Sequence, residues 1–269
     1  MLFHGQHFSM KHVLSKDGVP IAYEQRGNGL PLVLIHGAAA DHTRWAPILP
    51  GLEKYFTVYA IDRRGRGQSG DVEPYTIERE YEDVVAIVDS IPGPVNLLGH
   101  SYGAICSLEA SLKTPNLRKL VLYEPPIHTD DIKNNPPDAI DRMNSSLHIG
   151  EREKALLIFL REIVGIQDDE INKLQSLPSW SSRVASAHTI PREEASVSSY
   201  TLHPERFSKL ETPTLLLLGS DSPSFFRAAI EILGKSIPKS RIAIMPEQRH
   251  AAMDTAPELF LREIIGFLK

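Results

Sequence analysis

The residues best suited to chemistry are Gly99-His100-Ser101-Tyr102-Gly103, which have the pattern Gly-x-Ser-x-Gly. An apolar run at 95–98 precedes the pattern, and a helical run at 104–112 follows it. A serine on a tight turn between a strand and a helix is the context in which this pattern marks a nucleophile. The two glycines leave room in a turn too sharp for bulky neighbours. The pattern therefore predicts that the Ser101 hydroxyl stands exposed at the carboxyl edge of a sheet.

A serine hydroxyl is a weak nucleophile at neutral pH, so it needs a base. In chains with this kind of turn, the serine is followed first by an acid and then by a histidine. His250 comes after an apolar run at 241–245 and a short loop at 246–249, and it precedes the last helical run. We therefore predict that His250 is the base that removes the proton from Ser101.

Acyl transfer also needs hydrogen-bond donors at the place where a carbonyl oxygen becomes negative. One predicted donor is the backbone amide of Tyr102, which directly follows the nucleophile. The other is expected in the loop His36-Gly37-Ala38-Ala39-Ala40, which follows the third predicted strand. Within that loop we expect the amide of Ala38 to be the donor. The amides of Ala38 and Tyr102 thus form the predicted oxyanion hole.

The elements that must position these residues alternate between short apolar runs and amphipathic helical runs. This alternation is typical of a mainly parallel sheet with helices on both faces. The turn Lys16-Asp17-Gly18 joins the first two runs and predicts an antiparallel hairpin. Helices are predicted at 76–91 and after Pro257. The predicted strands are 11–14, 21–25, 32–35, 56–61, 95–98, 117–123, 214–218 and 241–245.

The segment 127–207 interrupts the alternation, because it has helical runs and no convincing strand. A simple crossover between two strands needs far fewer residues. We therefore predict a helical cap at 127–207, inserted after strand six into a core made of residues 1–126 and 208–269. The predicted cap helices are 137–147, 151–164, 168–177, 180–188 and 192–202.

Four motifs occur in a fixed order along the chain, and they carry a resemblance to a known family. They are Leu34-Ile35-His36-Gly37, the run 62–69 (Asp-Arg-Arg-Gly-Arg-Gly-Gln-Ser), the serine turn at 99–103, and Gln248-Arg249-His250. With them the chain resembles the α/β-hydrolase fold superfamily over nearly its whole length. The resemblance implies an α/β fold with a mostly parallel eight-stranded sheet, an inserted helical cap and no cofactor. It is specific for the fold and not for a substrate.

The acid that should orient His250 has two candidate positions. In most of the superfamily it lies three residues after the glycine that closes strand seven. Here that glycine is Gly219, so the position falls on Ser222, while Asp221 stands one residue early. Some haloalkane dehalogenases and lactone hydrolases of the superfamily carry the acid directly after strand six, where this chain has Glu124. Either carboxylate would orient the imidazole, and the departure from the usual spacing favours Glu124.

These residues together predict a serine hydrolase that works by two-step acyl transfer. Ser101 would attack a small to medium carboxylic ester or lactone, and water activated by His250 would release the acyl group. The alternatives on the same serine and histidine are a carbon–carbon bond hydrolase, a perhydrolase and a ligand receptor with slow turnover. We expect Trp45 and Tyr102 to contact the substrate. For Trp45, packing in the core is the alternative.

The composition of the chain argues against several classes of binding partner. Its 269 residues carry a net charge of −5 with both signs interspersed, which argues against nucleic acid or an anionic membrane as a partner. No apolar run reaches the roughly 18 residues of a membrane-spanning helix, and the first residues lack the pattern of a secretory signal. The single cysteine, Cys106, excludes an intrachain disulfide. We expect a cytoplasmic protein with a small-molecule substrate and no metal, and a homodimer remains open.

Overall fold

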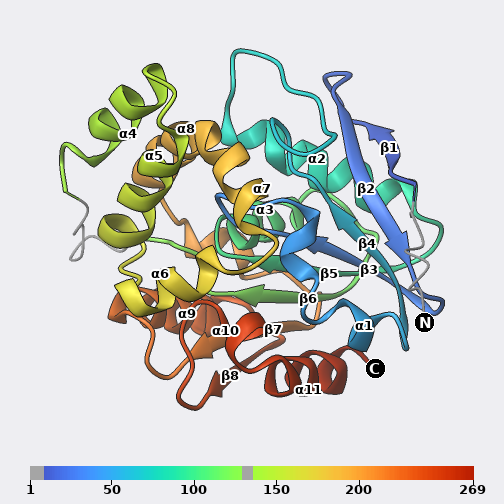
Figure 1. Ribbon diagram of the computed structural model, residues 1–269. Helices are drawn as coiled ribbons and strands as arrows, with labels where there is room; N and C mark the ends of the chain where they lie inside the picture. The colour runs from blue at the N-terminus through green and yellow to red at the C-terminus, as the bar shows by residue number, and fades with distance from the viewer. Residues whose placement is uncertain (1–8, 129–135) are drawn as a thin grey trace, which may run out of the picture.

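An eight-stranded sheet forms the centre of the computed structural model, which describes residues 9–128 and 136–269 (Figure 1). Its strand order is β1-β2-β4-β3-β5-β6-β7-β8. The pairs β1–β2 and β2–β4 are antiparallel, and every other neighbouring pair is parallel. The predicted mostly parallel sheet is therefore confirmed. The strands are β1 Lys11–Leu14, β2 Pro20–Arg26, β3 Leu30–Ile35, β4 Phe56–Ile61, β5 Val95–His100, β6 Leu117–Tyr123, β7 Thr214–Gly219 and β8 Ser240–Met245.

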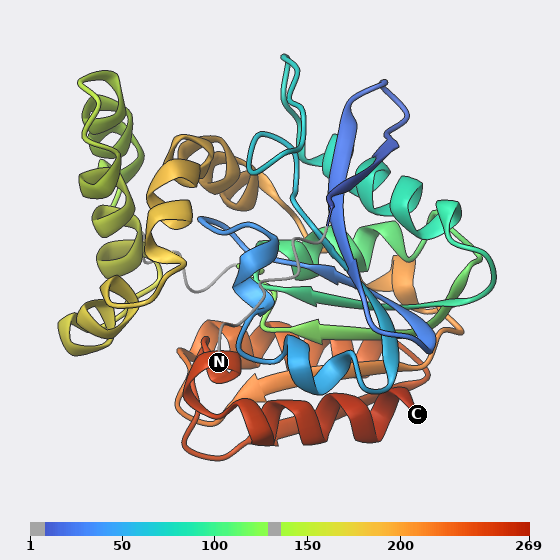
Figure 2. The same ribbon diagram turned by 45° about the vertical axis from the view of Figure 1, so that its right-hand side comes forward.

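Helices pack on both faces of this sheet, as the alternation of runs predicts. On one face lie α2 (Ile77–Ser90), α3 (Tyr102–Ala110) and α9 (Ser224–Ser236), whose apolar side chains share a core with β3 and β5. On the other face lie α1 (Leu49–Leu52) and α11 (Pro257–Leu268), preceded by the short α10 (Ala252–Thr255). Figure 2 shows α11, in red, and α2, in teal, on opposite sides of the strands. Because β5 is covered on both faces, all six of its residues are buried.

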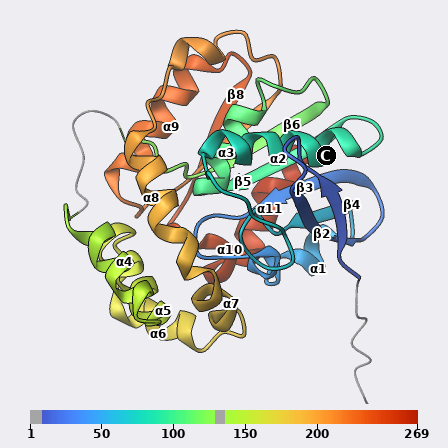
Figure 3. The same ribbon diagram turned by 90° about the horizontal axis from the view of Figure 1, so that it is seen from above.

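The described part of the chain between β6 and β7 contains helices joined by short loops, and no strand. Its helices are α4 (Ala139–His148), α5 (Arg152–Ile158), α6 (Asp168–Gln175), α7 (Trp180–Ala185) and α8 (Ile190–Ser199). A π-helical turn at Phe159–Ile163 continues α5, and 3₁₀ turns lie at Ser186–Thr189 and Pro204–Phe207. Apolar side chains of these helices form a separate core, and α8 lies between α4 and α3 (Figure 3).

The division into a core (1–126 and 208–269) and a cap (127–207) stays a prediction, and its residues 1–8 and 129–135 lie outside the described structure. Within the described residues, no helix has both the length and the apolar character that crossing a membrane requires.

The parallel part of the sheet brings distant loops to one edge. Strands β3, β5, β6, β7 and β8 all point the same way, so the loops that follow them begin side by side. These loops carry the predicted oxyanion loop, Ser101, Glu124, Asp221 and His250. Ligands of open parallel sheets bind at this carboxyl edge. The topology therefore places every predicted catalytic group within one region.

Candidate active site

Ser101 occupies a strained turn between β5 and α3. Its backbone has φ 56° and ψ −126°, a conformation that an L-residue rarely adopts. A Cβ at Gly99 would lie 2.5 Å from the carbonyl oxygen of Gly103, and a Cβ at Gly103 would collide with the carbonyl oxygens of Ile35 and His36. The two glycines are therefore needed for the turn, and they let the Ser101 side chain stand at the first turn of α3.

His250 is held from one side by a carboxylate and from another by an aromatic ring. Its Nδ1 donates to Oε2 of Glu124 over 2.6 Å. Its ring stacks on Phe226, with centroids 4.6 Å apart and planes 17° apart. Donation through Nδ1 leaves Nε2 without a proton, which is the tautomer that a general base needs.

Glu124 is fully buried, and each of its oxygens has donors. Oε1 accepts from the backbone amide of Gly219 at 2.7 Å and from the hydroxyl of Ser222 at 2.6 Å, while Oε2 accepts from His250. Its backbone φ of 48° turns the chain sharply at the end of β6. A buried carboxylate is tolerated when it is hydrogen-bonded in this way. The site is thus built to hold a negative charge behind the imidazole.

Asp221, the other candidate acid, points elsewhere. It is exposed, and its carboxylate accepts from the neighbouring hydroxyl of Ser220 at 2.7 Å. Its backbone amide donates to the carbonyl oxygen of Gln248 at 3.0 Å. None of the contacts of Asp221 in the described structure reaches His250. The geometry favours Glu124 over Asp221 as the acid.

Ser101 and His250 face the same hollow between the sheet edge and the helices of 136–207. One cavity is lined by both side chains and by Ala38, Phe159, Leu160 and Arg183. A second cavity begins at the same two side chains and at Ala38, and extends past Tyr102, Glu194, Phe225 and Phe226. The structure has no hydrogen bond between the Ser101 hydroxyl and His250. Catalytic hydrogen bonds often form only when substrate is bound.

The predicted oxyanion donors border this hollow. Ala38 lines both cavities, and Tyr102 is the first residue of α3. Neither backbone amide donates to a protein acceptor within residues 9–128 and 136–269. The oxyanion loop also approaches the nucleophile closely, because a Cβ at Gly37 would lie 2.8 Å from Cβ of Ser101. Both amides are therefore free to donate to a ligand oxygen near Ser101.

The two predicted substrate contacts differ in position. The Tyr102 side chain is buried and lines the second cavity, with its hydroxyl 2.6 Å from that of Tyr75 and the guanidinium of Arg63 over its ring. Trp45 is fully buried in the core beneath the sheet edge and is not among the residues that line either cavity. It packs edge-on against His100, with centroids 6.4 Å apart. The expected contact of Trp45 with the substrate cavity is therefore wrong, and Trp45 packs in the core, which was the alternative.

Two residues without a predicted role, His100 and Tyr123, hold the loop that carries His250. His100 Nε2 donates to the carbonyl oxygen of His250 at 2.9 Å, and burial holds the pKa of His100 well below its usual range. The Tyr123 hydroxyl donates to the carbonyl oxygen of Arg249 and accepts from the amide of Ala252 at 3.1 Å. Their positions, one inside the serine turn and one directly before Glu124, are the only sequence signals for this role.

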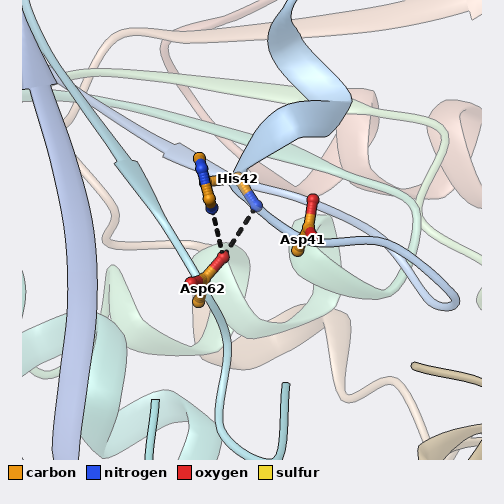
Figure 4. Close-up of side chains that lie close together, drawn as sticks. All are labelled: Asp41, His42 and Asp62. Carbon is orange, nitrogen blue, oxygen red and sulfur yellow. Dashed lines mark hydrogen bonds and ion pairs between the residues drawn. The ribbon is translucent and has the colours of Figure 1, made fainter. Parts of the chain in front are cut away.

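Asp41, His42 and Asp62 form a second cluster of polar groups (Figure 4). Asp62 Oδ1 accepts from both the amide and Nδ1 of His42, at 2.9 and 2.7 Å. Its Oδ2 accepts from the amide of Gln68 at 2.9 Å, and Asp41 caps the amide of Thr43. Burial acts against the charged ring, but the hydrogen bond and charge of Asp62 raise the pKa of His42. The two carboxylates thus already bind the imidazole of His42 and three backbone amides, those of His42, Gln68 and Thr43.

The chain is similar to known hydrolases over most of its length. Residues 32–263 match the family described as the Alpha/beta hydrolase family. An alpha/beta hydrolase from Sphaerobacter thermophilus DSM 20745 is 36% identical, with a TM-score of 0.85, over 96% of this chain and 100% of that one. The (E)-2-((N-methylformamido)methylene)succinate hydrolase of Acinetobacter baylyi is 25% identical over 88% of this chain and 89% of its own. The 2-(acetamidomethylene)succinate hydrolase of Mesorhizobium japonicum is 24% identical over 93% and 92%.

Proposed function

The chain belongs to the alpha/beta hydrolase family and is an enzyme of that family, and on this premise we propose that it is a serine hydrolase of small to medium carboxylic esters or lactones. The observation that carries the proposal is the 2.6 Å hydrogen bond between His250 Nδ1 and buried Glu124. It sets the imidazole to accept a proton through Nε2, and His250 lines the same cavities as Ser101. A nucleophile, a base and an orienting acid are thereby assembled at one point.

The first half of the proposed reaction forms an acyl-enzyme. Ser101 Oγ attacks the carbonyl carbon while His250 takes its proton, which is a contribution of about 10²–10⁴ in rate. The oxygen that becomes negative accepts from the amides of Ala38 and Tyr102, each of which is worth about 10²–10³. The tetrahedral intermediate then expels the alcohol, which receives the proton from His250. Glu124 keeps its hydrogen bond to Nδ1 throughout and stabilises the imidazolium.

The second half returns the enzyme to its starting state. His250 removes a proton from water, the resulting hydroxide attacks the acyl carbon, and the acid leaves as the proton returns to Ser101. The two half-reactions therefore use only the five groups already named and a water molecule. Both cavities are lined mainly by apolar side chains near the serine, which suits a substrate with an apolar frame around its carbonyl.

A second candidate is hydrolysis of an amidomethylene succinate. Two curated relatives that align with most of this chain carry the names of such substrates. The same serine, histidine and oxyanion amides would serve that reaction. Comparing an acetamidomethylene succinate with simple esters as substrates decides between the two candidates.

The experiment that tests the proposal is steady-state hydrolysis of p-nitrophenyl esters from acetate to a long acyl chain. We expect multiple turnovers that disappear in Ser101→Ala, while circular dichroism shows an unchanged fold. The acyl length with the highest kcat/KM measures the acyl pocket. Activity that survives in Ser101→Ala would overturn the assignment. A single stoichiometric burst would support the receptor alternative instead.

A further inference from the structure

An arginine from the helices between β6 and β7 reaches the cavity of Ser101 without a direct ion pair in the described residues. Arg183 lies in α7, is only 7% exposed and lines the cavity together with Ser101 and His250. Its guanidinium donates one hydrogen bond within the described residues, from Nη1 to the carbonyl oxygen of Ala39. The distance is 3.5 Å, which is the weak limit of such a bond. Its Nε is buried and has no protein partner.

The other buried arginines of the described residues show how unusual this is. Five arginines are buried, and four of them have carboxylate partners: Arg44 with Asp254, Arg63 with Glu80, Arg64 with Asp83 and Arg66 with Glu193. Arg183 has no ion pair in the described part of the chain. A buried charge without a partner is costly, because it has left water and gained little in return. The fold therefore keeps this guanidinium without a carboxylate at ion-pair distance, with Asp254 and Asp41 acting on it only from further away, at a place where a ligand can reach it.

The charged groups around Arg183 do not remove its positive charge. Arg44 lines the same cavity, and its Nη1 donates to Oδ2 of Asp254 at 2.6 Å. Asp41 accepts from both the amide and the hydroxyl of Thr43. Burial, followed by the charge of Arg44, lowers the pKa of Arg183 to about 10, although the charges of Asp254 and Asp41 act in the opposite direction, so the group is still protonated at neutral pH. The cavity thus carries a positive charge beside the oxyanion loop.

We propose that Arg183 binds a carboxylate of the substrate, so that the natural substrate is an ester or lactone that carries a second, ionised acid group. This inference rests on the proposed function, because it concerns the same cavity. A guanidinium presents two parallel N–H groups that match the two oxygens of a carboxylate. The cap side of the cavity that Arg183 lines is otherwise apolar, with Leu160, Val164 and Leu174. One guanidinium in such a wall suits the single charge of a carboxylate better than the double charge of a phosphate.

The test compares two matched pairs of esters that differ only in a carboxylate. For the acyl side, the pair is the mono-p-nitrophenyl ester of adipic acid and its methyl ester. For the alcohol side, the pair is 4-acetoxybenzoate and 4-acetoxybenzamide. We expect the wild-type enzyme to prefer the carboxylate in one pair by about 10- to 100-fold in kcat/KM, which is the range for hydrogen bonds to charged groups. Arg183→Met should reduce that preference at least about 10-fold. Arg183→Lys keeps the charge but lacks the two parallel N–H groups, so its preference should lie between those of the wild type and Arg183→Met.

The matched control is Arg152→Met, which removes an exposed arginine of α5 that does not line the cavity. It should leave the preference as in the wild type. A wild-type enzyme with no preference in either pair, or a preference that survives in Arg183→Met, would overturn the proposal. Neither result would affect the assignment of Ser101, because the neutral esters report on that independently.

Binding separates the failure of this proposal from the failure of the proposed function. Calorimetry with adipate on Ser101→Ala measures recognition of the carboxylate without any turnover. If no ester is hydrolysed but adipate binds Ser101→Ala and not Ser101→Ala/Arg183→Met, the proposed function is wrong and the carboxylate site stands. If adipate binds both variants equally, or neither, the carboxylate site is wrong whatever the esters show.

Discussion

The hydroxyl of Ser222 donates a 2.6 Å hydrogen bond to Oε1 of Glu124. Ser222 stands three residues after Gly219, the position that the resemblance assigns to the acid in most of the superfamily. In this chain the side chain at that position supports a carboxylate on a different strand. The acid end of the site is therefore shared between the ends of β6 and β7, and Gly219 contributes its amide to the same oxygen.

Removing the hydroxyl of Ser222 should weaken both the fold and the proposed catalysis. A hydrogen bond to a charged group is worth about 1.5–3 kcal/mol, so Ser222→Ala should lower the free energy of unfolding by about that amount. It should also lower kcat several-fold with little change in KM, because Glu124 then has one donor fewer to hold it against His250. Urea unfolding and ester hydrolysis measure the two effects. Ser220→Ala, which removes a hydroxyl bonded to Asp221 rather than to Glu124, is the control; equal losses in both variants would contradict this role.

Replacing the two candidate acids should have very different costs. Glu124→Gln removes the charge that orients His250 and stabilises the imidazolium, and loss of a triad acid has cost about 10⁴ in kcat elsewhere. Asp221→Asn changes an exposed carboxylate that does not contact His250, so its kcat/KM should stay close to that of the parent. Hydrolysis of the best p-nitrophenyl ester measures both. The reverse ranking would move the acid to the end of β7.

The sequence predicted the elements that local pattern determines. The run at 95–98 is apolar apart from Asn96 because β5 is covered on both faces, and the periodicity at 76–91 matches α2 within one residue at each end. The pattern at 151–164 predicted a single helix, whereas the structure has α5 followed by a π-helical turn at Phe159–Ile163. Hydrophobic spacing does not distinguish these two backbones, because both place apolar residues on one side.

The parts of the site that depend on distant segments could not be read from the sequence. Spacing favoured Glu124 but left Asp221 open, and the meeting of the loops after β6, β7 and β8 is what distinguishes the two carboxylates. For the same reason the apolar Trp45 was equally consistent with the cavity and the core. Nothing in the sequence indicated a role for Arg183. Helical spacing does not show which side chains surround an arginine, and so it does not show whether a carboxylate pairs with it.

A buried carboxyl at the second cavity should make stability fall as the pH rises. Burial, together with the charge of Glu193, raises the pKa of Glu194 from 4.5 to about 8. Between these values the folded chain holds a proton that the unfolded chain has lost, so the free energy of unfolding decreases with pH. Glu194→Gln removes this dependence. The free energy of unfolding of the variant, relative to that of the parent, should therefore increase as the pH rises from 5. The increase should be at most about 3 kcal/mol at pH 7.

Urea unfolding at pH 5, 6, 7 and 8 measures that gain for Glu194→Gln. A difference between variant and parent that is the same at every pH would show that Glu194 does not titrate in this range. The measurement isolates Glu194, because effects at distant sites add and cancel in the difference.

The ion pair of His42 and Asp62 should act on stability in the same pH range for the opposite chemical reason. Asp62 raises the pKa of His42, so the folded chain holds the proton of the imidazolium more tightly than the unfolded chain does. The stabilisation is fully present below the ordinary pKa of about 6.5 and is lost as the pH rises through the raised value. The parent should therefore exceed His42→Gln in stability most at pH 5.5–6, and the difference should shrink at alkaline pH. Urea unfolding of both proteins across this range, with exposed His188→Gln as the control, measures it. A difference that grows with pH would mean that the hydrogen bonds of neutral His42, rather than its charge, hold the two loops together.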